Sequence, residues 1–179
     1  MAIEISNTTE ITNQLMSSLN ISNPMAVPKI CKVVVNVGVG ESVTNKNAIP
    51  NVVDQITLIT GQKPVITKAR KSISAFKIRK GWPIGVKVTL RGKKMQYFLE
   101  KLITIVIPRL KDFRGIADSC VDSHGNLSIG FTEQTIFPEI EFDKIDKSRG
   151  LEVTIVTNAK DNAKGRKLFE LIGIAFKKN

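Results

Sequence analysis

The chain has 179 residues, enough for one globular domain of ordinary size or two small ones, and therefore enough to bury a sizeable core. Hydrophobic residues make up 42% and charged residues 24%, which excludes wholesale disorder, collagen-like repeats and coiled-coil arrays. Lys and Arg number 27 against 16 Asp and Glu, so the net charge of +11 favours a polyanionic partner: nucleic acid first, an anionic membrane surface second.

Neither cysteine indicates a disulfide scaffold or a zinc site, because Cys31 and Cys120 are the only two and lie 89 positions apart. Cys31 lies in an apolar run, so we expect a small core residue in a reduced, cytoplasmic protein. The N-terminus carries Glu4 and Glu10 without an early cation, unlike a signal peptide. The sequence contains no run of about 18 apolar residues, so we expect no transmembrane helix and no membrane partner.

Apolar residues recur at helical spacing in four segments. Helices are therefore expected over 10–19, 49–59, 95–110 and 161–176. The first belongs to an N-terminal helical segment over 1–24. Pro50 is tolerated only in a first turn, and Pro108 should bend or close the third helix.

Strand-like periods lie between these helices. Strands are expected over 29–39, 63–67, 86–91, 126–132 and 151–157. In the first strand four valines share one face, whereas Lys32, Val34 and Asn36 lie on the other. This irregular order predicts a single α+β domain over 25–179, with helices on one face of a mostly antiparallel sheet.

Positive charge is concentrated in one stretch, because no acidic residue occurs from Gly61 through Leu99. Eleven cations lie there: Lys63, Lys68, Arg70, Lys71, Lys77, Arg79, Lys80, Lys87, Arg91, Lys93 and Lys94. An ordinary solvated surface is the simpler explanation of a charge run. We favour a polyanion site, because a large field of one sign opposes the compact state by self-repulsion.

Within this stretch, the strand over 86–91 places its apolar residues on one face and Lys87, Thr89 and Arg91 on the other. Residues two apart are about 6.6 Å apart along a strand, a spacing that can follow a phosphate backbone. Thr89, Asn36 and Gln62 add hydroxyl and amide groups that can read sugar and base edges. The alternative is an ordinary solvent-facing strand.

The connection over 68–85 is longer than a usual hairpin loop, and such loops are functional or disordered. Its cations alternate with apolar residues, which predicts a protruding basic loop that embraces RNA, with Phe76 or Trp82 available for stacking. The alternative is that both aromatic residues only pin the loop to the sheet. For Trp82, between Gly81 and Pro83, we favour this alternative.

Apparent enzyme signatures are incomplete. Gly38-x-Gly40 lacks the third glycine of a dinucleotide fingerprint, and His124 lies in a turn. Glu139, Glu141 and Asp143 alternate as on an exposed strand. We expect no catalytic residue, metal or cofactor. The alternative to nucleic-acid binding is a membrane-surface protein, for which an amphipathic helix over 161–178 would be needed. The apolar stripe of that helix is explained more simply as part of the core.

Four collinear runs within residues 25–176 resemble the family of bacterial large ribosomal subunit protein five. They are PKICKVVVNVGVGES, ITGQKPVITKARKSISAFKIRKGWPIGVKVTLRG, ITIVIPRLKDFRG and GNLSIGFTEQTIFPEIEFDKIDKSRGLEVTIVT. The resemblance implies an α+β fold, no catalysis, and binding of 5S rRNA in the central protuberance of the ribosome. It also implies contacts with 23S rRNA, peptidyl-site (P-site) tRNA, the small-subunit head and other central-protuberance proteins.

The resemblance implies that Asn36, Gln62 and Thr89 contact 5S rRNA. With the neighbouring glycine and cations, the expected 5S rRNA site is Asn36, Gly38, Gln62, Lys63, Lys68, Arg70, Lys71, Lys87, Thr89 and Arg91. The expected tRNA-facing residues of the loop are Ser72, Phe76, Lys77, Ile78, Arg79 and Lys80.

Negative charge has its own stretch, because no Lys or Arg occurs from Asp118 through Asp143. RNA should avoid this surface, whereas a basic protein would be steered toward it. The resemblance offers a candidate, protein thirteen of the small-subunit head, for which Glu139, Glu141 and Asp143 would form the bridge. A solvated acidic edge that keeps the sheet from pairing with other chains is an equal alternative.

Overall fold

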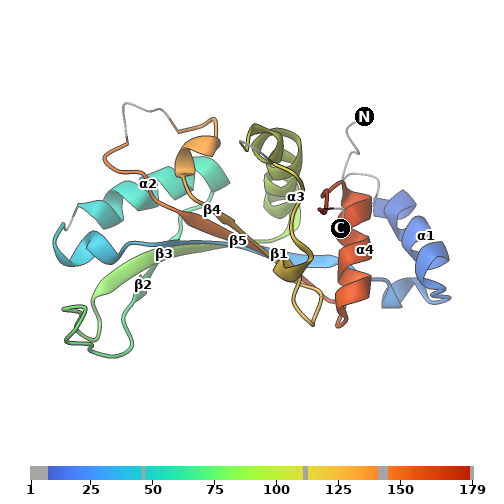
Figure 1. The fold of residues 1–179 in the computed structure, drawn as a ribbon, viewed down its shortest axis with the longest axis horizontal. Helices are drawn as coiled ribbons and strands as arrows, with labels where there is room; N and C mark the ends of the chain where they lie inside the picture. The colour runs from blue at the N-terminus through green and yellow to red at the C-terminus, as the bar shows by residue number, and fades with distance from the viewer. Residues whose placement is uncertain (1–7, 46, 111–112, 141–144, 178–179) are drawn as a thin grey trace. The chain divides into compact units, whose positions relative to one another are not determined.

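The computed structural model describes residues 8–45, 47–110, 113–140 and 145–177. The chain forms two compact units (Figure 1). Unit 1 draws on Met1–Val33, Arg91–Ile129 and Thr154–Asn179, and unit 2 on Val34–Leu90 and Gly130–Val153. Each unit therefore combines segments that are far apart in the sequence.

One five-stranded antiparallel sheet supplies strands to both units, in the order β2-β3-β1-β5-β4. Its strands are β1 (Ile30–Gly38), β2 (Val65–Lys68), β3 (Pro83–Leu90), β4 (Leu127–Phe131) and β5 (Leu151–Thr157). The described residues also form four α-helices: α1 (Thr8–Leu19), α2 (Ala48–Thr60), α3 (Gly92–Lys101) and α4 (Asn162–Ile172). The predicted α+β class is confirmed.

In unit 2, α2 buries an apolar stripe, and it contacts β3. The stripe consists of Ala48, Ile49, Val52, Ile56 and Ile59. Pro50 is the third residue of α2, within the first turn, where its missing N–H leaves no helical hydrogen bond unmade. Gly61 ends the helix in the left-handed region, at a φ of 64°, and its N–H bonds Thr57 O at 2.8 Å.

The two central strands alternate as predicted. In β3, Val86, Val88 and Leu90 are buried, whereas Lys87 is exposed and Thr89 half-buried. In β1, the valines at 33, 35 and 37 are buried, whereas Asn36 is exposed. Each strand therefore directs its apolar side chains into the core and its polar ones to the opposite face.

In unit 1, α1 packs against α4. Leu15 of α1 is only 1% exposed and shares a core cluster with Val27, Leu168 and Ile172. The N-terminal helix is thus an integral part of unit 1, because its apolar stripe closes over that of α4.

The long helix predicted over 95–110 is a run of three hydrogen-bonding patterns. After α3, Leu102–Val106 is a π-helix and Ile107–Arg109 is a 3-10 helix. Pro108 lies in this last turn, which agrees with the expectation that it closes the helix.

The helix predicted over 161–176 is too long, because α4 ends at Ile172. Gly173 adopts a φ of 101°, and the N–H of Ile174 bonds back to Phe169 O at 3.0 Å. The chain then turns away, and Phe176 forms a β-bridge with Ile116. The helical spacing of Phe176 misled the prediction, since the left-handed glycine stops the helix first.

The placement of Cys31 in the core is wrong, because Cys31 is exposed. The buried face of β1 is covered only from Val33 onward, so a residue at the start of the strand stays open to solvent although its neighbours are apolar. Local apolar composition does not report where the covering element begins.

The prediction that Glu139 lies on an exposed strand is also wrong. Gln134–Ile136 is a 3-10 helix, and Glu139 lies in the exposed turn that follows. The buried residues here are Phe137 and Ile140, and the N–H of Ile140 bonds Phe137 O at 3.2 Å. Their spacing of three is that of a turn, not of a strand. Glu141 and Asp143 lie outside the described residues.

Candidate nucleic-acid interface

The polar residues of β1 and β3 meet on one face of unit 2. The N–H of Val39 bonds Ile84 O at 2.9 Å, and the antiparallel register set by this bond places Asn36 opposite Lys87. Val65 of the neighbouring β2 pairs with Lys87 from the other side. Asn36 and Lys87 therefore lie side by side on the exposed face of three adjacent strands.

Gln62 joins this face through the turn after α2. Its Nε2 donates to Thr89 O at 3.2 Å, so the side chain lies against β3. The Thr60 hydroxyl lies 2.7 Å from Ile56 O and 3.1 Å from Gln62 O, which ties the turn to the helix end. The structure thus places Asn36, Gln62 and Thr89 on the same face of unit 2. We call Asn36, Gln62, Lys63, Lys87 and Thr89 the basic sheet face.

Two glycines keep part of this face flat. The same register places Gly38 opposite Gly85. A Cβ on Gly85 would lie 2.8 Å from the Thr67 Oγ1 and 2.9 Å from Val37 O, so no other residue fits without rearrangement. Gly38 is exposed with open space around it. The main chain is open to solvent at Gly38, which allows close approach of a ligand there.

The predicted cations of unit 2 are exposed around this face. Lys63 and Lys87 belong to it, and Lys68, Arg70 and Lys71 lead from β2 into the loop. Arg91 belongs to unit 1, where its Nη1 lies 3.5 Å from Cys31 O. Arg91 is therefore placed by the start of β1, and we describe it apart from the basic sheet face.

The basic loop, residues 69–82, is an ordered hairpin that extends beyond the ends of β2 and β3 (Figure 1). Ala69 N donates to Trp82 O at 2.8 Å, and Ile73 and Ile78 exchange two main-chain bonds of 2.9 and 3.1 Å. Lys80 N bonds the Ser72 hydroxyl at 3.0 Å. The predicted protruding loop is therefore held by its own main chain.

The tip of the basic loop presents Phe76 and Lys77 to solvent. Lys77 has a φ of 54° and its N–H bonds Ser74 O at 2.9 Å, which closes the turn. The Phe76 side chain is 68% exposed, and Arg79 and Lys80 are exposed beside it. An exposed aromatic ring among cations is typical of surfaces that bind single-stranded nucleic acid.

A cluster that the sequence did not reveal lies in unit 2 beside Gly38. The Arg149 side chain is only 6% exposed. It donates to Glu41 through Nε at 2.6 Å and to Asp146 through Nη1 and Nη2 at 2.8 and 2.7 Å. Lys147 Nζ also donates to Glu41 at 2.9 Å. The spacing of Asp146 and Arg149 was a visible signal, but Glu41 is more than a hundred positions away in the sequence.

The cluster is satisfied on all sides. Gln134 accepts a bond from Arg149 N and donates to Lys147 O at 2.7 Å. The hydrogen bond from Arg149 holds the pKa of Asp146 well below its usual range, with a contribution from Asn51 of α2. The bond from Lys147 lowers the pKa of Glu41, and the bond to Asp146 raises the pKa of Arg149. We call Glu41, Gln134, Asp146, Lys147 and Arg149 the Arg149 cluster.

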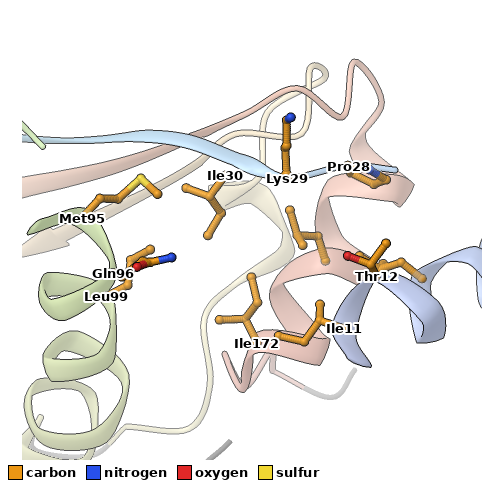
Figure 2. A pocket seen from close by; sticks show the side chains of 11 residues that line it. Ile11, Thr12, Pro28, Lys29, Ile30, Met95, Gln96, Leu99 and Ile172 are labelled. Atoms are coloured by element: carbon orange, nitrogen blue, oxygen red, sulfur yellow. The ribbon is translucent and has the colours of Figure 1, made fainter. Parts of the chain in front are cut away.

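Unit 1 contains an apolar hollow of about 200 Å³ (Figure 2). Met95, Gln96 and Leu99 of α3 line one side, and Ile11 of α1 and Ile172 of α4 line the other. The Lys29 side chain points away from it (Figure 2). The described residues that line the hollow include no carboxylate or imidazole, so it has no acid or base for catalysis.

His124 is an exposed turn residue, as predicted. The Asp122 Oδ1 accepts the N–H of His124 at 2.9 Å and that of Asn126 at 2.7 Å, which explains the turn. Across the part of the chain that the structure describes, no group of three or more His, Cys, Asp or Glu side chains is placed to hold a metal ion. Among those same residues, no helix is long and apolar enough to span a membrane.

Two family models match this chain: "Ribosomal protein L5" over residues 23–79, and the model for the C-terminus of the same ribosomal family over residues 83–176. The large ribosomal subunit protein uL5 of Brevibacillus brevis is 49% identical over 171 residues, which cover 96% of this chain and 95% of that protein. The large ribosomal subunit protein uL5 of Dictyoglomus thermophilum is 52% identical over 169 residues, 94% of each chain. The similarity extends over both units; the first family match ends within the basic loop, and the second begins at the first residue of β3.

Proposed function

Because the chain belongs to the ribosomal protein L5 family, whose members are structural, non-enzymatic components of the large ribosomal subunit, we propose that its basic sheet face binds 5S rRNA there. Its partners as a subunit component are ribosomal RNA and other ribosomal proteins. Its place in translation is thus structural, and the polar face of unit 2 is the part of it that recognises RNA.

One observation carries this proposal. Asn36, Gln62 and Thr89 come from three separate segments, and the fold gathers them beside Lys87 on one face, where Asn36 and Lys87 are exposed and Gln62 and Thr89 are half-buried. Amide and hydroxyl groups next to cations combine base or sugar recognition with phosphate binding. The exposed cations Lys68, Arg70 and Lys71, at the strand end beside the flat Gly38 and Gly85 region, extend the surface available to the RNA backbone.

The basic loop is proposed to contact P-site tRNA. Its tip carries exposed Phe76, Lys77, Arg79 and Lys80, and main-chain hydrogen bonds within the loop hold it as a hairpin. A rigid, cationic hairpin can reach an RNA that does not touch the basic sheet face. Contacts with 23S rRNA would use the remaining basic surface.

The acidic segment, which carries Glu139, Glu141 and Asp143, is proposed to face protein thirteen of the small-subunit head. Glu139 is exposed in its turn, and it follows β4, which is an edge strand of the sheet. The edge position equally favours the alternative of a solvated acidic margin that prevents pairing with other chains. Within the large subunit, the other proteins of the central protuberance would be neighbours of this chain.

The test of 5S rRNA recognition uses three single variants: Asn36→Ala, Gln62→Ala and Thr89→Ala. Each removes polar groups worth about 1 to 3 kcal/mol of discrimination, so 5S rRNA affinity should fall roughly 5- to 150-fold in a gel-shift titration. Ser128→Ala, an exposed hydroxyl on β4, is the matched control and should bind like the wild type. Three folded variants with wild-type affinity would show that the recognition surface lies elsewhere.

A further inference from the structure

Trp82 is the single tryptophan of the chain and lies where the basic loop enters β3. Its N–H donates to Arg79 O at 3.1 Å, and its carbonyl accepts the N–H of Ala69 at 2.8 Å. The main chain of Trp82 therefore closes the base of the loop. The residue is 39% exposed, so part of it is accessible to a ligand.

One side of Trp82 borders an apolar hollow of about 530 Å³. Its other apolar walls are Val43, Ile49, Pro50, Ile66 and Pro83. The hollow is preformed, because the Ser42 hydroxyl bonds Pro83 O at 2.6 Å and so fixes the segment after β1 against the base of the loop. An indole beside apolar proline and aliphatic side chains suits a planar, weakly polar group.

Trp82 also borders a second hollow, of about 600 Å³, inside the loop. Here the neighbouring side chains are polar or cationic: Ser72, Ser74, Lys77 and Arg79, with Ile78. Trp82 therefore borders both an apolar space and one lined with cations and hydroxyl groups. No acidic residue lies within 61–99, so the loop that lines the polar hollow carries only positive charges.

We propose that Trp82 stacks on one unpaired nucleobase of the RNA bound by the basic loop. The base occupies the apolar hollow, and its ribose and phosphate lie against the hydroxyl groups and cations of the polar hollow. A nucleotide joins a planar ring to a negative charge, which matches the two hollows that Trp82 borders. This inference rests on the proposed RNA binding by the loop and adds a distinct preference for an unpaired nucleotide.

The first test uses the tryptophan fluorescence of the wild-type protein. Because Trp82 is the single tryptophan of the chain, all of this emission comes from it. An RNA hairpin with one unpaired nucleotide in its stem is compared with a fully paired hairpin of equal length. We expect both to bind through the cations, but only the first to quench Trp82 strongly. Equal quenching by the two hairpins would overturn the inference.

The second test compares Trp82→Leu with Trp82→Phe. Leucine keeps the apolar volume but cannot stack, so the preference for the hairpin with an unpaired nucleotide should fall about fivefold to tenfold, whereas phenylalanine should keep most of it. Tyr97→Leu makes the same kind of change at an exposed residue of α3, outside the basic loop, and is the matched control, which should retain the preference. A Trp82→Leu protein with the full preference contradicts the proposal.

The loop's wider role is tested separately by replacing Lys77, Arg79 and Lys80 with Gln. If these changes weaken both hairpins while Trp82→Leu changes neither, the stacking inference fails and the RNA-binding loop stands. If the Gln variant binds both hairpins like the wild type, the loop function itself fails. Protection of Trp82 from acrylamide by an acidic peptide, but by neither hairpin, would make the ligand a protein and would also overturn the inference.

Discussion

At the scale of single residues, the Arg149 cluster determines how acid acts on the protein. The pKa of Asp146 and the pKa of Glu41 are held below their ordinary values of 3.8 and 4.5 by bonds from Arg149 and Lys147. A lowered pKa contributes stability above the ordinary value, and this contribution is lost as the pH falls toward the folded-state pKa. Acidification should therefore weaken unit 2 through these carboxylates.

We predict that the free energy of unfolding decreases as the pH falls below about 5, and that Asp146→Asn makes this decrease shallower. Urea unfolding at several pH values between 7 and 3 measures it. Glu152→Gln, on the exposed face of β5, is the control and should keep the wild-type slope. An Asp146→Asn protein with an unchanged pH profile would exclude this carboxylate as the source.

Residue contacts of this kind mark the limit of what the sequence predicts. Alternation in β1 and β3 is local, so the valine face and the positions of Asn36, Lys87 and Thr89 followed directly from spacing. The bond between Arg149 and Glu41 joins distant segments, and no local pattern contains it. Cys31 failed for the same reason, because its exposure depends on where a distant element covers the strand.

At the scale of elements, the packing of α1 against α4 depends most on Leu15, the buried residue that α1 contributes to their shared core cluster. Leu15 is nearly fully buried against Leu168 and Ile172 of α4. We predict that Leu15→Ala lowers the free energy of unfolding by about 2 to 5 kcal/mol, since it removes a buried side chain and leaves a cavity. Asn13→Ala, on the exposed face of α1, should change it little in the same thermal or urea experiment.

For the basic loop we expect an effect on RNA binding and not on stability, because the loop contributes charge to the surface and almost nothing to the core. Its residues are almost all exposed, and its main-chain bonds are internal. Replacing Lys77, Arg79 and Lys80 with Gln should reduce the slope of log affinity against log salt by about 2 to 3 for RNA bound by the loop. Deleting residues 70–80 should leave a folded protein; loss of cooperative unfolding after the deletion would show that the loop belongs to the core.

At the scale of the whole molecule, a net charge of +11 is divided into separate basic and acidic stretches. We predict that changing Glu139, Glu141 and Asp143 to Lys leaves binding to isolated 5S rRNA unchanged but weakens the joining of ribosomal subunits at moderate salt. The physical reason is electrostatic steering, which acts mainly on association rate. Sedimentation of subunit mixtures measures it, and unaltered joining would favour the solvated-edge alternative.

The order of strands in the sheet has a consequence for how the protein is made. β1 lies between β3 and β5, although β5 is synthesised more than a hundred residues after β1. Until β5 emerges from the ribosome, one edge of a valine-rich strand has no partner and can pair with another nascent chain. A newly made chain should therefore depend on chaperones until its last third is complete, and truncation before residue 151 should yield aggregates rather than a smaller RNA-binding domain.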